Sequence, residues 1–559
     1  MRKRVLASSP ETFDYIIIGA GSAGCVLAHR LSEQTSSTVL VLEAGGADRV
    51  LAVRVPAALI TLDPKYDWGY KAEPDTSRHN VVERCAAGKV IGGGSSVNAM
   101  LWTRGHAGDY DHWAAQGCPG WGFQAVLPYF RRAEHFEGGG NAFRGVGGPQ
   151  WVSHLRVSHP MTDRFVAAAE EAGYCYNEDY NGTRQQGVAY TQLSQKRGLR
   201  HSTACAYLAP ARKRRNLTLR TNATVSRILI DGRRAIGVEY RTAHNRLRAH
   251  CRREIILAAG ALTSPKLLMI SGIGPAAHLR EHGINVIVDS QGVGQNLQDH
   301  PYISMSYMVT VRTLNQDTTP TRALWHGLDF MLRRRGALTS PAAHAIIFSS
   351  FDRSSPWSDC EIIFSPLGIT ANTNDVGVSS SSQSSGDPSG HQSAKRTRAL
   401  LPSAVVMVHS SICHPKARGT VRLRSPHPED PPVIRHRLLG EVEDLVGLTT
   451  VCRTARAIFR TATMRSYVLS EQLPGNRVDN DDDWFKYLRR YAFRAEHPVG
   501  TCRMGYGSHA VVDEQLRVRG IDNLRVIDAS IMPTLPSGNT NAPTIMVAEK
   551  GSDLIRTAR

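Results

Sequence analysis

Three glycines near the start of the chain have the spacing of a phosphate-binding turn. Gly19, Gly21 and Gly24 form the pattern G-x-G-x-x-G and directly follow the apolar run Tyr15–Ile18. A buried parallel strand that leads into such a turn presents backbone N–H groups and the positive end of the next helix to a pyrophosphate. Glu43 ends the next β-rich run, where a carboxylate can accept hydrogen bonds from ribose hydroxyls. The pattern predicts a dinucleotide-binding unit.

A second glycine-rich stretch, GKVIGGGSSVNAM, covers residues 88–100. Three consecutive glycines remove side chains at a place where a backbone can touch a flat ligand. Ser95, Ser96 and Asn98 can then donate hydrogen bonds to a flavin or to a phosphate. Judged from these residues alone, a flexible loop is equally compatible, and the choice between NAD and FAD stays open.

The overall composition favours a multidomain globular protein with a basic surface. The chain has 559 residues, with 67 Lys and Arg against 49 Asp and Glu, which gives a formal net charge of +18. The densest basic runs, 212–215 and 333–335, are not part of any nucleic-acid motif, so we expect no nucleic-acid partner. Attraction of the positive surface to acidic lipid headgroups stays an open alternative.

Other classes of protein are disfavoured by the motifs that the sequence lacks. The ten cysteines show no metal-ligand spacing, so we expect no metal site. The N-terminus has no apolar signal core, and the longest apolar stretch, 255–273, is interrupted by Pro265 and Lys266. We therefore expect a cytoplasmic protein, with peripheral association with the inner membrane as an alternative.

Several longer motifs resemble the glucose–methanol–choline (GMC) oxidoreductase family. They occur in the family's order from about Phe13 to about Ile555, and the similarity weakens between about Thr310 and Leu400. Within the family, the chain is most similar to the bacterial choline-dehydrogenase-like and alkanol-dehydrogenase branch. The motifs are GAGSAGCVLAHRLSE, LEAGG, GKVIGGGSSVNAMLWTRG, DYDHWAAQG, IILAAGALTSPKLLMISGIGP, GVGQNLQDHP, HPVGTCRMG and SGNTNAPTIMVAEK.

The resemblance implies a mixed α/β fold with two interleaved domains. A Rossmann-like FAD-binding domain would use residues 13–155, 210–305 and 500–559. A substrate domain built on an antiparallel sheet would use residues 156–209 and 306–499. The residues agree with a nucleotide fold at both ends of the chain, because segments 254–260 and 524–528 are typical of buried strands and a helical pattern starts at Thr263. The serine-rich segment 376–398 departs from the family and is expected to be a flexible surface loop.

The chemistry of alcohol oxidation requires a base for the hydroxyl proton and a donor that holds the oxygen as charge develops. The resemblance assigns these roles to His497 in the motif HPVGT and to Asn541 in the motif NTNAP. Pro543 favours a helix start there, so that the positive end of the helix would face the flavin. His300, in the motif NLQDHP, is interpreted as structural. Glu496 is expected to point into solvent rather than toward His497.

The family's motifs also predict the contacts of the cofactor. Some relatives bind flavin covalently through a histidine just before the asparagine of the second glycine-rich motif. Val97 occupies that position here, so we expect dissociable FAD. The residues expected to contact FAD are Gly19, Gly21, Ser22, Gly24, Glu43, Ala44, Val90, Gly93, Asn98, Ala99, Met100, Val225, Asp528, Ala529, Asn541, Pro543 and Thr544.

Three functions remain open on these residues. The first is a dehydrogenase that oxidises a primary alcohol and passes the electrons to a quinone or another acceptor. The second is an oxidase that passes them to O2 and releases H2O2. The third is a lyase or photoenzyme of the same fold, which the pairing of His497 with Asn541 disfavours. The branch resemblance favours the dehydrogenase.

Overall fold

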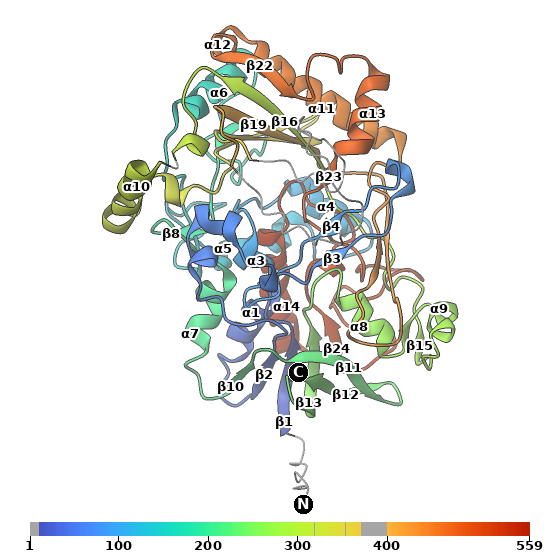
Figure 1. The fold of residues 1–559 in the computed structure, drawn as a ribbon. Coiled ribbons are helices and arrows are strands. Elements are labelled where there is room, and N and C mark those ends of the chain that lie inside the picture. Colours follow the sequence, from blue (N-terminus) through green and yellow to red (C-terminus); the bar gives the residue numbers. More distant parts are fainter. Residues whose placement is uncertain (1–10, 318, 353, 370–399, 559) are drawn as a thin grey trace, which may run out of the picture.

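The computed structural model describes residues 11–317, 319–352, 354–369 and 400–558. Its two large β-sheets lie at opposite ends of the molecule, with helices and long connecting segments between and around them (Figure 1). The serine-rich segment 376–398, expected to be a surface loop, lies outside the described residues.

The first sheet is the nucleotide-binding type that the glycine motif predicts. Its strand order is β10-β2-β1-β13-β12-β11, and β24 pairs with β13. The central strands are parallel, and their apolar residues, such as Ile16 and Ile17, are completely buried, as expected for a parallel sheet covered on both faces. The strands are β1 (Glu11–Ile18), β2 (Val39–Leu42), β10 (Leu217–Arg220), β11 (Thr224–Asp231), β12 (Arg234–Arg241), β13 (Arg246–Leu257) and β24 (Leu524–Val526).

The second sheet is antiparallel and has the order β22-β16-β19-β18-β17-β7, with β23 beside β16. Helices α6 (Pro160–Glu171) and α11 (Val442–Arg460) cover one of its faces. Helix α13 (Asp481–Tyr491) packs on α11, and all three helices share an apolar core with the sheet. The strands are β7 (Gly187–Tyr190), β16 (Pro301–Val309), β17 (Ala345–Ser349), β18 (Cys360–Ser365), β19 (Val405–Ile412), β22 (Val468–Leu473) and β23 (Phe493–Arg494). The expected fold class, a Rossmann-like unit combined with an antiparallel sheet, is confirmed.

Strands from distant segments alternate between the two sheets, as an interleaved chain requires. Strand β16 lies wholly in the second sheet and runs across the boundary that we placed between residues 305 and 306. The precise division of the chain into two domains stays a prediction.

The longer helices surround the two sheets, and α1 and α14 pack against each other beside the first sheet. They are α1 (Ser22–Leu31), α4 (Ala107–Ala115), α5 (Phe123–Ala133), α6 (Pro160–Glu171), α8 (Ser264–Ile270), α10 (Pro320–Arg333), α11 (Val442–Arg460), α13 (Asp481–Tyr491) and α14 (Asn541–Thr557). The helix expected from Thr263 is α8, and the helical pattern that follows Pro543 lies within α14. In the described part of the chain, no helix is long and apolar enough to cross a membrane.

Short elements complete the connections between these layers. The short helices are α2 (Leu51–Arg54), α3 (Gly94–Val97), α7 (Ala209–Ala211), α9 (Ala276–Glu281) and α12 (Ala462–Arg465). The short strands are β3 (Tyr70–Lys71), β4 (Arg84–Cys85), β5 (Glu134–Phe136), β6 (Gln150–Val152), β8 (Gln195–Lys196), β9 (Leu199–Arg200), β14 (Ile273–Gly274), β15 (Val288–Asp289), β20 (Thr420–Arg422) and β21 (Val433–Arg435).

Candidate active site

The first glycine motif forms a tight turn between β1 and α1. Gly19 has a φ of +98°, which favours glycine, and its N–H donates to the Leu42 carbonyl at 2.8 Å. A Cβ atom at Gly24 would lie only 1.9 Å from the Gly19 carbonyl oxygen, so the helix packs on the strand too closely for a side chain. Gly21 is the N-cap of α1 and offers no side chain to the helix's first N–H groups. These donors suit a phosphate.

The second glycine-rich stretch packs directly on the first. A Cβ atom at Gly93 would lie 2.8 Å from Cα of Gly21, and the Gly92 N–H donates to the Ala20 carbonyl at 2.7 Å. Val90 forms a parallel β-bridge with Gly46, just beyond β2. The two segments therefore meet backbone to backbone, which is the arrangement that a flat ligand with a pyrophosphate needs.

Glu43 is buried at the end of β2, where it supports the same turn. Its carboxylate accepts hydrogen bonds from the N–H groups of Ala20 and Gly45, both at 2.7 Å, and burial raises its pKa. Ala44 lies between Glu43 and Gly45 in the chain. The Ala223 N–H donates to the Glu43 carbonyl at 2.8 Å, which places Val225, in β11, close to the end of β2. Ribose binding by Glu43 stays a prediction.

The N-termini of two helices converge beside this turn. Ser22, the first residue of α1, donates from its hydroxyl to Oδ1 of Asn541, the first residue of α14, at 2.8 Å. Pro543 and Thr544 occupy the first turn of α14, as the helix-start pattern predicts. Because each N-terminus carries a partial positive charge, the pair favours an anionic ligand between them. The residues present therefore fit FAD.

Asp528 and Ala529, two further residues predicted to contact FAD, lie in an ordered turn. The Asp528 carboxylate accepts hydrogen bonds from the Gly260 N–H at 2.8 Å, the Ser264 hydroxyl at 2.6 Å and the Ser530 N–H at 2.8 Å. These contacts fix the short helical turn that begins at Ala529.

Residues 97–100 follow the second glycine-rich stretch. Oδ1 of Asn98 accepts hydrogen bonds from the Met100 N–H at 3.0 Å and from Arg200 at 2.7 Å. Met100 is buried and has a φ of +66°, whereas Ala99 is exposed and Val97 is half-buried.

His497 is placed by antiparallel pairing between two distant motifs. Gln298 and Val499 form an antiparallel bridge, and Pro301 pairs with Arg494 where β16 meets β23. The motifs NLQDHP and HPVGT therefore run side by side. The backbone N–H of His497 donates to the Asp299 carboxylate at 2.8 Å, which fixes the chain at the histidine.

The contacts of His300 define the tautomer of His497. Nε2 of His300 lies 3.0 Å from the Cys413 carbonyl oxygen, and Nδ1 of His300 lies 3.0 Å from Nδ1 of His497. A carbonyl only accepts, so Nε2 of His300 carries a proton. Burial lowers the pKa of His300 to about 4, so the ring is neutral and its Nδ1 accepts. His497 must then donate from Nδ1.

Nε2 of His497 is consequently unprotonated and can accept a hydrogen bond at neutral pH. Burial, followed by the neighbouring His300 and Arg494, holds the pKa of His497 well below its ordinary value of 6.5. A neutral imidazole with a fixed tautomer is the state that a general base requires.

Asn539 is the amide that contacts this nitrogen. Its Nδ2 lies 3.0 Å from Nε2 of His497, and the Thr103 hydroxyl donates to its Oδ1 at 3.3 Å, in agreement with that orientation. Asn539 was not predicted from the sequence, because the motif NTN offers two asparagines and spacing does not show which one turns toward His497. The predicted Asn541 instead contacts Ser22.

Two neighbouring residues were also interpreted from the sequence. His300, interpreted as structural, is buried and directly contacts His497, and its role stays a prediction. Glu496 faces away from His497, as expected. Its side chain is 36% exposed and accepts a hydrogen bond from Arg494 at 2.8 Å.

The second sheet presents aromatic and acidic side chains toward His497. The Tyr302 ring lies edge-on to the His497 ring, with their centroids 6.2 Å apart, and its hydroxyl donates to Glu361. Oε1 of Glu361 is buried without a hydrogen-bond partner, and burial raises the pKa of this carboxyl to about 7. Phe348 lies opposite Glu361 on the adjacent strand. These groups form a largely apolar wall that contains one carboxyl group.

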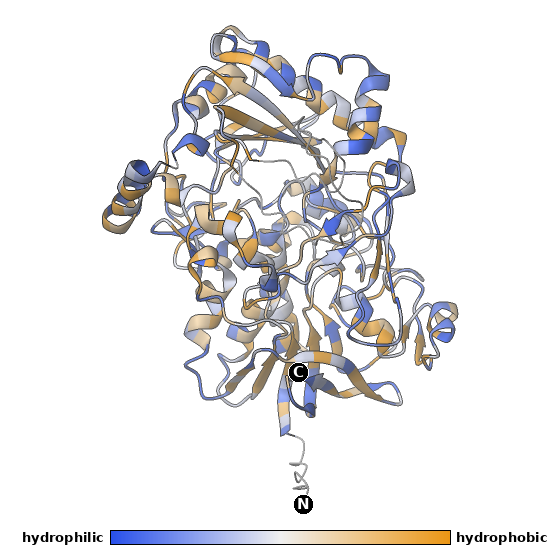
Figure 2. Ribbon diagram, in the orientation of Figure 1, coloured by the Kyte–Doolittle hydropathy of each residue, from blue (hydrophilic) through white to orange (hydrophobic). Residues whose placement is uncertain are grey.

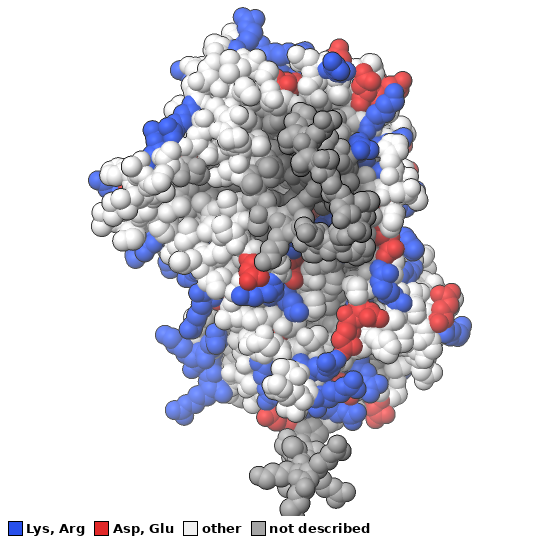
Figure 3. Space-filling model, viewed as in Figure 1, with Lys and Arg blue, Asp and Glu red and all other residues white. Residues whose placement is uncertain are grey.

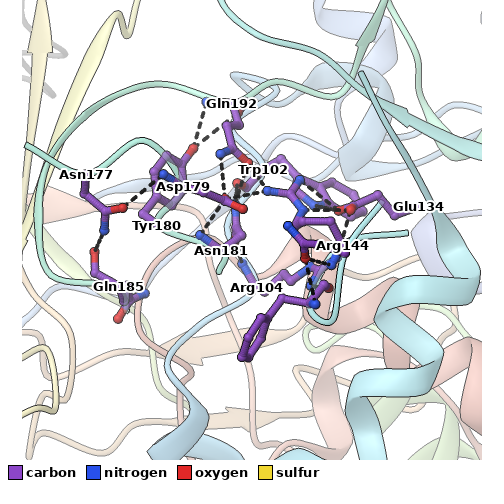
Figure 4. Close-up of polar contacts among 12 residues, drawn as sticks. Trp102, Arg104, Glu134, Arg144, Asn177, Asp179, Tyr180, Asn181, Gln185 and Gln192 are labelled. Atoms are coloured by element: carbon purple, nitrogen blue, oxygen red, sulfur yellow. Dashed lines mark hydrogen bonds and ion pairs between the residues drawn. The ribbon is translucent and has the colours of Figure 1, made fainter. Parts of the chain in front are cut away.

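A buried polar network joins Trp102, just after the second glycine-rich segment, to residues of the segment 156–209 that we expect in the substrate domain (Figure 4). The guanidinium group of Arg144 contacts both carboxylate oxygens of Glu134, at 2.8 and 3.2 Å, and also Asp179 at 2.6 Å and Gln192 at 2.7 Å. Glu134 also accepts from the Trp102 indole at 2.8 Å, two residues beyond Met100. The network thus anchors the segment that leads away from the predicted flavin contacts.

Solved structures of several flavoenzymes share this fold. The pyridoxine 4-oxidase of Mesorbium loti superimposes with a TM-score of 0.84 at 29% identity, covering 97% of this chain and 98% of that chain. A formate oxidase of Aspergillus oryzae, described with modified FAD, superimposes with a TM-score of 0.88 at 26% identity and 99% coverage of both chains.

Curated relatives are similar over almost the whole length. The chain is 38% identical to the mitochondrial choline dehydrogenase of Mus musculus, over 99% of this chain and 91% of the relative. It is 37% identical to an oxygen-dependent choline dehydrogenase of Brucella suis, over 97% of this chain and 95% of the relative.

The fold and the site together define an FAD-dependent oxidoreductase that acts on the CH–OH group of a small-molecule alcohol. The model of the GMC oxidoreductase family matches residues 13–302 with its N-terminal part and residues 415–548 with its C-terminal part. The chain belongs to the GMC oxidoreductase family.

Proposed function

We propose that this protein is a dehydrogenase that oxidises a primary alcohol to an aldehyde, with His497 as the general base. The observation that carries the proposal is the array Cys413–His300–His497, which leaves Nε2 of His497 unprotonated in a buried site, where the Asn539 amide contacts it. A hydroxyl is a poor hydride donor until its proton is partly removed, so such a base is the first requirement.

The residues can carry out the proton half of the reaction. The hydroxyl proton of the substrate moves to Nε2 of His497, while the carbon loses hydrogen with its electron pair and the C–O bond becomes a carbonyl. FAD, when bound, supplies the acceptor for that hydride. The Asn539 amide, which contacts Nε2 itself, is proposed as one donor to the developing alkoxide, and Asn541, at the positive end of α14, is proposed as the second.

We further propose that FAD is held without a covalent bond. Val97 has no nucleophilic atom, and the phosphates would contact the turn at Gly21 and Gly93 and the first turns of α1 and α14. Denaturation with acid is expected to release all of the flavin into the supernatant. Flavin that stays with the precipitated protein would contradict this part of the proposal.

Choline is the first substrate to examine. The wall beside His497 combines Tyr302 and Phe348 with the carboxyl group of Glu361, and aromatic faces together with an acidic group suit a quaternary ammonium. The similarity to choline dehydrogenases supports the same choice. Simple aliphatic and aromatic primary alcohols form the comparison set.

For the electron acceptor we propose a quinone or another electron carrier. We place the protein in the cytoplasm, in peripheral contact with the inner membrane, because its net charge of +18 favours anionic lipid surfaces. An oxidase that uses O2 is the competing outcome, since the same base and the same cofactor serve both reactions.

The test is an anaerobic titration of the FAD-loaded protein with choline and other primary alcohols. The flavin absorbance is expected to bleach in the wild-type protein and not in His497→Ala, whereas His427→Ala, at an exposed histidine, should behave as wild type. After bleaching, a quinone should restore the colour faster than air does. Rapid recovery in air with H2O2 would establish the oxidase, and a yellow protein that ignores every alcohol would contradict the proposal.

A further inference from the structure

Helix α10 projects from the side of the molecule and exposes an unusual amount of apolar surface (Figure 1). Five of the fifteen large hydrophobic side chains that are exposed in the described part of the chain lie on this one helix. They are Leu324 (66% exposed), Trp325 (61%), Leu328 (43%), Met331 (68%) and Leu332 (80%). Such a concentration on a projecting element indicates a binding surface, whereas single exposed apolar residues are normal.

The five residues form one stripe. Their spacing, i, i+1, i+4, i+7 and i+8 from Leu324, confines them to about a third of the helix circumference at 3.6 residues per turn. Phe330 lies on the opposite side of the helix and is buried. One side of α10 therefore anchors the helix to the body while the other side faces outward. Apolar and polar bands accordingly alternate along the helix in Figure 2.

Basic side chains surround the stripe. Arg322 and Arg333–Arg335 are exposed at the two ends of α10. The backbone of Gly198 lies against the Arg334 carbonyl, so the exposed Lys196 and Arg197 lie beside the same end. The two acidic residues nearby form ion pairs, Asp317 with Arg322 and Asp329 with Arg333. In Figure 3 the projecting end is mostly uncharged, with blue patches above and below it.

We propose that α10 docks the protein on an anionic lipid bilayer, with its apolar stripe in the interface and the arginines at the phosphate level. An amphipathic helix with large apolar residues on one side and basic residues on the flanks is the form that lies in a membrane interface. Fourteen residues span only about 21 Å, which suits a helix lying on the bilayer rather than crossing it. A second copy of the chain would bring two sets of arginines together, so the lipid surface is the better partner.

A chain of contacts also links the end of α10 to a predicted flavin contact. The chain leaves α10 and forms a short turn at Ala337–Thr339. Nε2 of Gln195 donates to the Thr339 carbonyl at 2.9 Å and lies 3.7 Å from Sδ of Met100, a predicted flavin contact. A lipid-dissolved quinone would then be a suitable electron acceptor. This consequence rests on the proposed function, whereas the docking itself does not.

The first experiment measures co-sedimentation of the FAD-loaded protein with vesicles. Vesicles of phosphatidylcholine mixed with phosphatidylglycerol should bind the wild-type protein, and vesicles of phosphatidylcholine alone should bind it much less. The double variant Trp325→Asp/Leu328→Asp should lose at least about tenfold in binding. The matched control, Leu469→Asp/Val446→Asp, changes two apolar residues of similar exposure, 60% and 51%, in β22 and α11, and should bind as wild type. Protein that stays in the supernatant with both vesicles, or a double variant that binds as wild type, would overturn the proposal.

Two further measurements separate the alternatives. Sedimentation velocity of the wild-type protein and of the double variant, in the absence of lipid, tests whether the stripe of α10 binds a second copy of the chain instead. If the wild-type protein is a dimer that does not bind vesicles and the α10 variant is a monomer, the stripe serves self-association and the proposal is overturned. Bleaching of the flavin by alcohol in lipid-free solution should be the same in both proteins, which shows that the variant is folded. Because that assay needs no membrane, its failure would concern the proposed function and not the docking.

Discussion

Cys413 fixes the state of His497 through one intervening ring. Its carbonyl can only accept a hydrogen bond, so the proton position on His300 is determined, and with it the proton position on His497. Because burial keeps both rings neutral near pH 7, the result is a base with its lone pair on Nε2. We therefore expect His300 to influence the chemistry through His497.

Substitution of His300 should separate positioning from a merely structural role. In His300→Leu the acceptor for Nδ1 of His497 is lost, and kcat should fall by about 10- to 100-fold because the fixed tautomer is lost. In His300→Asn the side-chain oxygen can take the place of Nδ1, and most of the activity should return. Stopped-flow bleaching under anaerobic conditions measures both. Equal losses in the two variants would contradict the positioning role.

The pH dependence of kcat/KM should report the low pKa of His497. Only the unprotonated ring accepts the substrate proton, and burial moves protonation to more acidic pH than the ordinary value of 6.5. As the pH falls from about 8 to 6.5, kcat/KM should stay constant, and it should decrease only well below that range. An acid limb with a midpoint near 7 would show that the histidine is not desolvated in this way.

At the level of elements, the nucleotide site depends on backbones that touch. The turn after β1 and the second glycine-rich stretch meet at Gly21 and Gly93, and α1 meets α14 at Ser22 and Asn541. Two helix N-termini and two side-chain-free segments meet here, so a small displacement of either segment should weaken FAD binding more than it weakens the fold.

Two glycines with similar backbone angles allow a direct test of this close approach. At Gly93 a Cβ atom would lie 2.8 Å from Cα of Gly21 and φ is +50°, so Gly93→Ala should lower the affinity for FAD by at least about tenfold, or about 1.4 kcal/mol. Gly232, in the turn between β11 and β12, has a φ of +57° and a Cβ atom there meets nothing within 4 Å, so Gly232→Ala serves as the control. Fluorescence titration of the apoprotein with FAD measures both affinities. Similar values for the two variants would be inconsistent with the contact.

For the whole molecule, the polar network around Arg144 joins the segment behind the second glycine stretch to the substrate side (Figure 4). A buried arginine that contacts two carboxylates cannot lose one partner without leaving charge uncompensated in the interior. The network therefore serves the mutual placement of the cofactor and substrate parts as well as stability.

Removal of this arginine should be costly. Arg144→Ala leaves Glu134 without its bidentate partner, and we expect a loss of about 3–5 kcal/mol. Arg248→Ala, which breaks an exposed pair with Glu239, should cost at most about 1 kcal/mol. Melting temperatures of the FAD-loaded proteins compare the two. Comparable melting temperatures for both variants would show that the network contributes little.

The sequence by itself determined the features that depend on local backbone requirements. The turn at Gly19, Gly21 and Gly24 needs residues without side chains, and the strand, turn and helix that surround it follow from a short periodic pattern. The same reasoning located α8, β24 and the first turn of α14, and the family resemblance supplied FAD and the antiparallel second sheet.

Only the tertiary structure decided which side chains meet at His497. His300 and Cys413 reach it through strand pairing between segments far apart in the chain, and the register of that pairing is not encoded in any short motif. The choice of Asn539 over Asn541 depends on how a single turn is oriented before α14. The outward stripe of α10 is likewise a tertiary result, because an amphipathic pattern shows that one side is apolar but not whether the body covers that side.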